Sequence, residues 1–116
     1  MSAHQTAVKA AHLAQEKNGQ HIVIIDISDK ASYADFFVIA SGTSNVQVKA
    51  IAEHVEKELK NQDIRPYHKE GYEYQNWILL DYVDVVVHIF REETRSFYGI
   101  ERLWADAKME FIKEEA

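Results

Sequence analysis

The chain contains no cysteine, one proline and four glycines among its 116 residues. Without cysteine it has no disulfide, no thiol nucleophile and no thiolate metal site. So little proline and glycine argues against flexible linkers, and neither a repeat of solenoid length nor a low-complexity tract is present. Because 47% of the residues are hydrophobic, the sequence predicts one compact domain over residues 1–116 with a single core.

Long apolar runs are also missing. No stretch reaches the length that a membrane-spanning helix needs. The first five residues do not combine a basic region with an apolar run, and no segment rich in arginine and serine resembles a transit peptide. We therefore expect a cytoplasmic protein.

Positive charge is the scarcer sign. Lysine and arginine number 13 against 19 aspartates and glutamates, which gives a net charge of −6. Proteins that bind phosphate backbones usually gather their cations in one place, whereas those of segment 49–60 are scattered among acids. Direct, sequence-specific nucleic-acid binding is thus disfavoured. A basic protein partner is favoured, because unlike charges speed encounter, although a modest negative charge also serves solubility alone.

The first half of the chain predicts two helices and two strands. Ser2 and Gln5 have the spacing of a capping box, and the helix that they begin should stop at Asn18 and Gly19. Apolar, β-branched runs at 22–27 and 36–40 are typical of buried strands. Ser44 and Gln47 repeat the capping-box spacing before an amphipathic helix that ends within 63–66.

From residue 67 the hydrophobic period changes to two. We expect a short edge strand at 67–70, followed by strands at 75–81 and 85–90 that the short segment between them joins into an antiparallel hairpin. The tail, about 93–115, is predicted to be helical, with Gly99 as a possible break. One side of that helix would carry the apolar residues Ile100, Leu103, Trp104, Ala107 and Phe111. This order predicts a single-domain α/β fold with a mixed five-stranded sheet flanked by helices.

Few residues suggest catalysis. The turn Ser41–Ser44 joins a strand to a helix, where free amides attract anions, and a turn of this kind opens the active site of nucleotidyltransferases. Those enzymes also need a closely spaced acidic pair for divalent metal, and none follows. We therefore favour a capped helix. Asp81 and Asp84 flank the hairpin turn and could hold a metal, but we favour the turn interpretation, because aspartate in a tight turn more often bonds its own backbone.

Six histidines are present, and none forms a pair at the one-turn spacing of zinc sites. His88 stands out because it interrupts an apolar strand. Either it is a core or edge histidine with a hydrogen-bond partner inside the chain, or it is a polar group meant for a binding partner. Both interpretations stay open at this point.

Trp77 lies in a strand whose alternation sends Gln75, Leu79 and Asp81 to the same face. Large apolar centres with polar ends are typical of a protein–protein patch, in which an aromatic anchor is surrounded by a polar rim. The alternative is that the C-terminal helix covers Trp77, with Tyr82, Tyr98 and Trp104 as candidate covering groups.

Three ordered blocks span almost the whole chain. They comprise residues 35–44, 47–48 and 50–52, then 70–71, 77–82 and 84–90, then Arg95, Tyr98, 100–101, 103–104 and Ala107. Together they resemble the signature blocks of the Iojap or ribosomal silencing factor family. Phe36 stands where tyrosine is common in that family and Ile100 where leucine is common, and both keep the physical character of the position.

The resemblance implies a fold similar to nucleotidyltransferases without their catalytic residues, and hence no enzyme activity and no cofactor. It implies binding to ribosomal protein fourteen of the large subunit, at the face where the subunits join. The bound factor would obstruct the small subunit and lower translation when nutrients are scarce. It also implies a homodimer away from the ribosome. The alternatives are a residual nucleotidyltransferase that binds a nucleotide at Ser41–Ser44 and a plain dimerisation module.

Strand alternation and the resemblance together predict nine partner-binding residues. Trp77 and Leu79 are expected to be apolar anchors. The acids facing a basic partner are expected to be Glu70, Asp81, Asp84 and Glu101. The orienting polar or aromatic contacts are expected to be Tyr82, His88 and Tyr98.

Overall fold

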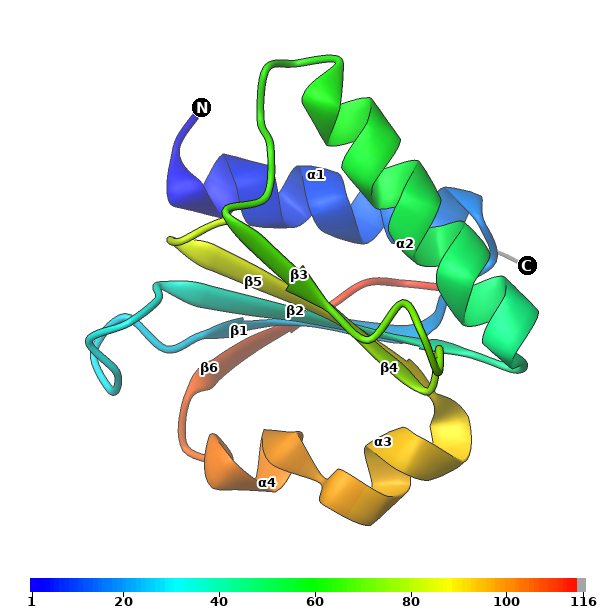
Figure 1. Ribbon diagram of the computed structural model, residues 1–116. Coiled ribbons are helices and arrows are strands. Elements are labelled where there is room, and N and C mark those ends of the chain that lie inside the picture. Colours follow the sequence, from blue (N-terminus) through cyan, green and yellow to red (C-terminus); the bar gives the residue numbers. More distant parts are fainter. Residues whose placement is uncertain (115–116) are drawn as a thin grey trace.

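A sheet with helices on both faces organises the chain in the computed structural model, which describes residues 1–114 (Figure 1). Helices α1 (Ala3–Glu16) and α2 (Asn45–Lys60) cover one face, whereas α3 (Glu92–Tyr98) and α4 (Ile100–Leu103) cover part of the other. The sheet is therefore the middle of three layers. This confirms the predicted α/β class with helices on both sides of a mixed sheet.

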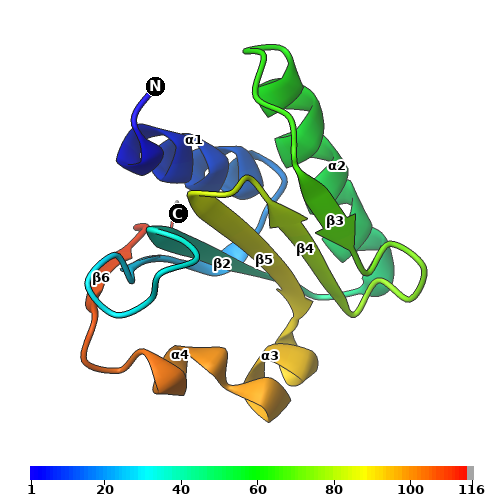
Figure 2. The ribbon, with the colours of Figure 1, turned by 60° about the vertical axis from the view of Figure 1, so that its left-hand side comes forward.

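The sheet has six strands rather than five, in the order β3-β4-β5-β2-β1-β6. Their bounds are Gln20–Asp26 for β1, Phe36–Gly42 for β2, His68–Glu70 for β3, Trp77–Asp81 for β4, Val85–Arg91 for β5 and Lys108–Phe111 for β6. Among the strands of residues 1–114, only β2 and β5 pair in parallel, through the crossover that contains α2, and all other neighbours are antiparallel. The hairpin of β4 and β5 is confirmed. Strand β3 forms the edge next to α2 (Figure 2).

The additional strand corrects the prediction of a helical tail. Gly99 has φ +52° and separates α3 from α4, and the chain then turns and pairs Lys108 to Phe111 with β1. Leu103 and Phe111, which were expected on the apolar side of a helix, are 75% and 71% exposed. The spacing that looked helical was thus produced by two short helical turns followed by a strand. Residue 115, the end of the predicted helix, lies outside the described residues.

Of the two predicted capping boxes, the one at α1 is complete and the one at α2 is half formed. At α1, Ser2 Oγ accepts from the Gln5 amide and the Gln5 side chain accepts from the Ser2 amide, so the capping box is complete. At α2, Ser44 Oγ accepts from the Gln47 amide at 3.1 Å. The reciprocal bond is absent from the described residues, because Gln47 Oε1 accepts from the Thr43 amide and hydroxyl instead, at 2.6 and 2.8 Å.

Two cores lie on opposite sides of the sheet. The larger one fills the space under α1 and α2, and Ile78 and Leu80 of β4 are completely buried in it. The smaller one lies on the side of α3 and α4, and half-buried Trp77 and Leu79 border it. The alternation predicted for β4 is therefore correct. It leaves the Trp77 side of the strand only partly covered.

Candidate functional site

The partly covered side of β4 continues across its two neighbours. In the antiparallel register, Glu70 of β3 lies opposite Leu79, and Leu79 lies opposite His88 of β5. Residues paired in this way project from the same face of a sheet. Trp77, which pairs with Phe90, and Asp81 belong to the same row. With Tyr98 from the end of α3, the partly covered surface comprises Glu70, Trp77, Leu79, Asp81 and Tyr98, and we name it the Trp77 face.

Trp77 is held from three sides. Its ring centroid lies 4.7 Å from that of Phe90 and 5.1 Å from that of Tyr98. Its indole N–H donates to His88 Nδ1 at 3.1 Å. Tyr98 itself remains 53% exposed, so α3 covers one flank of the indole without sealing it. The C-terminal part of the chain thus packs against the ring through Tyr98, as the covering alternative expected, and Trp77 is half-buried rather than sealed. Its role as the anchor of a protein–protein patch stays a prediction.

The imidazole of His88 is buried beneath this aromatic group and is only 4% exposed. Because an indole N–H can only donate, His88 Nδ1 must be the acceptor, and the proton of the neutral ring resides on Nε2. Nε2 has no hydrogen-bond partner within residues 1–114. The ring of Phe37 lies edge-on, 4.6 Å away between centroids. His88 therefore orients Trp77 from below and does not itself reach a partner.

Burial lowers the pKa of His88 to about 3, since the charged imidazolium would lose its hydration. Between pH 6.5 and 3, the unfolded chain, in which this histidine has an ordinary pKa, therefore binds a proton that the folded chain does not bind. His88 therefore adds no pH dependence to folding well above pH 6.5, and it destabilises the folded chain increasingly as the pH falls from 6.5 toward 3. Between pH 7 and 5, its share of the free energy of unfolding should fall by about 2 kcal/mol.

The measurement is urea unfolding of the wild type and of His88→Phe at pH 7 and pH 5. The wild type should lose more stability than the variant over this interval, and the difference isolates His88 from the five other histidines. Equal pH dependence of the two proteins would show that His88 titrates normally in the folded state.

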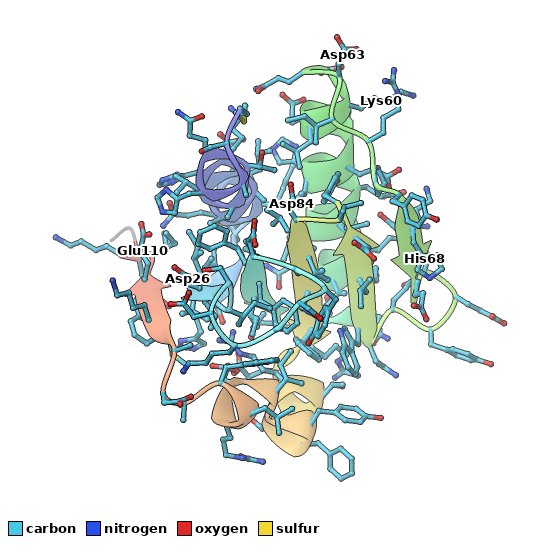
Figure 3. All side chains as sticks on the ribbon, turned by 90° about the vertical axis from the view of Figure 1, so that its left-hand side faces the viewer. Asp26, Lys60, Asp63, His68, Asp84 and Glu110 are labelled. Atoms are coloured by element: carbon cyan, nitrogen blue, oxygen red, sulfur yellow. The ribbon has the colours of Figure 1, made fainter. Side chains whose placement is uncertain are left out.

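Acidic groups border the Trp77 face on the side of β3. Glu70 is exposed, and its carboxylate lies 2.9 Å from Nε2 of His68. Figure 3 shows His68 at the outer edge of the sheet, on the side opposite Glu110 of β6. Asp81 is half-buried, and its Oδ1 accepts from the Val83 amide at 2.8 Å, which confirms the turn interpretation.

The structure separates two predicted site residues from this face. Tyr82 packs against the core on the side of α1 and α2, and its hydroxyl is buried without a hydrogen-bond partner in the described part of the chain. Burial, followed by the nearby Glu56 carboxylate, raises the pKa of that hydroxyl. Asp84 is exposed at the β4–β5 turn (Figure 3), and Trp77 begins β4 at the opposite end of that strand. The Tyr82 hydroxyl is therefore not offered to a partner, and Asp84 lies outside the Trp77 face.

Glu101 is bound inside the molecule by Arg95. Nε and Nη2 of Arg95 donate to the two carboxylate oxygens of Glu101 at 2.8 and 3.0 Å, and Nη1 donates to Ser41 Oγ at 2.7 Å. Arg95 is 7% exposed, so this is a buried, charge-assisted clamp that joins α3, α4 and β2. Sequence reasoning found Arg95 only as part of the third block and assigned it no role. The spacing rules for helices and strands do not predict an ion pair between residues on either side of a glycine in the left-handed conformation.

The Ser41–Ser44 turn is closed by its own contacts. Ser41 is completely buried and accepts from Arg95, and the Thr43 amide and hydroxyl both donate to Gln47. Three polar groups of this turn, the Ser41 hydroxyl and the Thr43 amide and hydroxyl, are therefore bonded within the chain. Within residues 1–114, no three histidine, aspartate or glutamate side chains group as a metal site would require. Likewise, none of the helices described there has the length and hydrophobicity to cross a membrane.

Comparison with known proteins identifies the family and the relatives of this chain. The family model described as "Ribosomal silencing factor during starvation" matches residues 1–116. The chain belongs to this family. One relative, the ribosomal silencing factor of Halalkalibacterium halodurans, is 37% identical over 107 residues, which cover 92% of each chain. A mouse protein named "Mitochondrial assembly of ribosomal large subunit protein 1" is 35% identical over 95 residues, which cover 79% of this chain and 42% of the mouse protein.

Solved structures of the family share the fold. A crystal structure of a protein from Chromobacterium violaceum superposes with a TM-score of 0.88 at 34% identity, and the alignment covers 100% of this chain and 97% of that one. The three-layer arrangement that positions the Trp77 face is therefore found in a relative of this silencing-factor chain.

Proposed function

We propose that this protein binds the large ribosomal subunit through ribosomal protein fourteen and keeps the small subunit from joining. The observation that carries the proposal is the Trp77 face, a partly exposed aromatic anchor on a rigid sheet, in a chain that belongs to the silencing-factor family. The names of two relatives add support, since one is a ribosomal silencing factor and the other refers to assembly of the large subunit.

The geometry of the face suits a protein partner. Trp77 and Leu79 offer apolar area that the fold leaves half-covered, and Glu70 and Asp81 border it with negative charge. Aromatic anchors in a polar rim contribute most of the binding free energy at such interfaces. Ribosomal proteins are generally basic, so the net charge of −6 would steer the encounter.

Occupancy alone would produce the effect. A rigid domain on the joining face of the large subunit excludes the small subunit sterically, so no bond is made or broken and no cofactor takes part. The strength of repression would follow the concentration and affinity of the protein. An interface of roughly 1,200 to 2,000 Å² in total would be enough. A protein acting on ribosomes in this way would be cytoplasmic and would lower translation under nutrient limitation.

The direct test is co-sedimentation with purified, separated ribosomal subunits. The protein should travel with large subunits and not with small ones. When large subunits are preincubated with it, light scattering should report fewer joined ribosomes after small subunits are added. Absence from the large-subunit fraction, or normal joining at saturation, contradicts the proposal. A titration with nucleotide and divalent metal should show no binding.

The homodimer implied by the family resemblance is part of the same proposal. Trp77 and Tyr98 are the groups that a second copy would cover if it used this face. In that case large subunits would convert dimers into bound monomers, and sedimentation velocity with and without large subunits would detect the exchange. A dimer that survives on the subunit would place its contact elsewhere on the surface.

A further inference from the structure

A hollow beside Trp77 has no role in the site described so far. It lies between the β3–β4 loop and α3 and has a volume of about 380 Å³. Aromatic and polar side chains line it, chiefly Tyr74, Asn76, Trp77, Glu93, Phe97 and Tyr98. We name it the aromatic cup.

Four aromatic rings meet at the cup, and three of them are exposed. Tyr74 is 73% exposed, Phe97 is 78% exposed and Tyr98 is 53% exposed. Tyr98 lies between Trp77 and Phe97, with centroid separations of 5.1 Å to each, and the Phe97 ring is perpendicular to it. A contiguous group of exposed apolar side chains usually marks an interaction surface, whereas single exposed apolar side chains are common on any protein.

The wall formed by the β3–β4 loop is held in place. Asn45 Nδ2 of α2 donates to the Tyr74 carbonyl at 2.8 Å and to Asn76 Oδ1 at 3.0 Å. The Arg91 amide donates to the Asn76 carbonyl at 2.9 Å. Gly71, with φ +92°, begins this loop, and a side chain there would collide with the Trp77 carbonyl oxygen. The cup is therefore preformed rather than shaped by a ligand.

Among the described residues, the lining of the cup has one carboxylate, Glu93, and no lysine or arginine. Arg91 donates to one oxygen of Glu93 at 2.9 Å from outside the cup and so offsets its charge, but the carboxylate remains 67% exposed and can accept a further donor. The π faces of the four rings carry negative potential. The rings and the exposed carboxylate together favour a cation over an anion.

We propose that the aromatic cup receives an arginine side chain of the protein partner, an inference that rests on the proposed function and names the chemistry of that contact. A guanidinium is planar and weakly hydrated, so it can stack on tyrosine, tryptophan and phenylalanine. Its five N–H donors suit the carboxylate of Glu93 and the polar wall at Asn76, whereas a lysine ammonium is a compact, strongly hydrated charge. The cup adjoins the Trp77 face through Trp77 and Tyr98, so one partner can occupy both.

The first test compares ring and aliphatic variants in large-subunit binding. Phe97→Leu and Tyr74→Leu keep apolar bulk at exposed positions but remove the ring, and each should weaken binding about 2- to 5-fold. Tyr74→Phe should bind more tightly than Tyr74→Leu. Leu103→Ala, which changes a 75% exposed side chain outside the cup, is the control and should bind as the wild type does. Unaltered binding of both leucine variants would overturn the inference.

The second test needs no ribosome. The peptides Gly-Arg-Gly, Gly-Lys-Gly and Gly-citrulline-Gly are titrated into the ¹⁵N-labelled protein at low salt, with the amides of Thr94, Phe97 and Tyr98 as reporters. Only the arginine peptide should give saturating shifts at millimolar concentration, and Phe97→Leu should reduce them. An equal response to lysine or citrulline, or none to arginine, would overturn the inference.

The two proposals fail in different ways. If the wild type ignores large subunits while the arginine peptide binds the cup, the proposed function fails and the chemistry of the cup stands. If the wild type binds large subunits and the leucine variants match it, only the role of the cup is lost.

Discussion

Trp77→Ala should weaken binding to large ribosomal subunits by about 30-fold or more, which corresponds to about 2 kcal/mol. The substitution removes a large apolar group that is half-buried and fixed, since Phe90, Tyr98 and His88 hold the indole in a single orientation. An anchor held in this way loses little conformational freedom on binding, so truncating it costs more than truncating a mobile aromatic. Co-sedimentation over a range of protein concentrations measures the loss.

Two matched variants make the result specific. Tyr67→Ala removes an aromatic side chain that is 82% exposed near the same edge of the sheet but outside the Trp77 face, and it should bind nearly as the wild type does. Trp77→Phe keeps a ring but cannot donate to His88, so its affinity should lie between those of the wild type and Trp77→Ala. If Trp77→Ala remains folded and sediments normally with large subunits, the Trp77 face is not the docking surface.

Much of this face could be read from the sequence because it is encoded locally. A strand alternates its side chains with a period of two, so the apolar partners Trp77 and Leu79 had to share a face, with Ile78 and Leu80 on the other. The paired register then adds Glu70 without further information. Periodicity together with a hairpin-length turn was sufficient to predict this part of the fold.

The same alternation argues against the role predicted for Tyr82. Tyr82 has the parity of Ile78 and Leu80, and it packs with them into the core on the side of α1 and α2 rather than beside Trp77. Val83 then turns the chain with φ +73°, and Asp84 lies at the turn end of the hairpin. Strand parity alone therefore places Tyr82 correctly, and its assignment to the partner-binding residues did not follow that parity.

Contacts distant in sequence were missed for a different reason. Strand β6 forms because the outer edge of β1 is available for pairing. Its four residues are mostly exposed, so they have no hydrophobic pattern from which this pairing could be predicted. The exposure of Glu101 was also misjudged, since its partner Arg95 lies across the left-handed turn at Gly99, and Ser41, the third member of the clamp, is 54 positions from Arg95. Such groupings are produced by the tertiary fold rather than by local sequence.

Glu101→Ala should lower the free energy of unfolding by about 3 kcal/mol, because it leaves the buried guanidinium of Arg95 with Ser41 Oγ as its remaining partner. This expected loss is at the low end of the range for breaking a buried ion pair, because the Glu101 side chain is itself 31% exposed. Urea denaturation measures the loss. The exposed pair of Lys30 and Asp106, 3.2 Å apart, provides the comparison, and Asp106→Ala should cost less than 1 kcal/mol.

The double variant Arg95→Met/Glu101→Met decides what the clamp contributes. It removes both charges, so its stability should recover to well above that of Glu101→Ala, because no unpaired charge remains buried. If Glu101 only holds the α3–α4 turn that carries Tyr98 to Trp77, the folded double variant should regain binding to large subunits along with stability. If the double variant regains stability but not binding, Glu101 is an acid that contacts the partner, as first predicted. If Glu101→Ala and Asp106→Ala lower the free energy of unfolding equally, the clamp contributes no more than an ordinary surface ion pair.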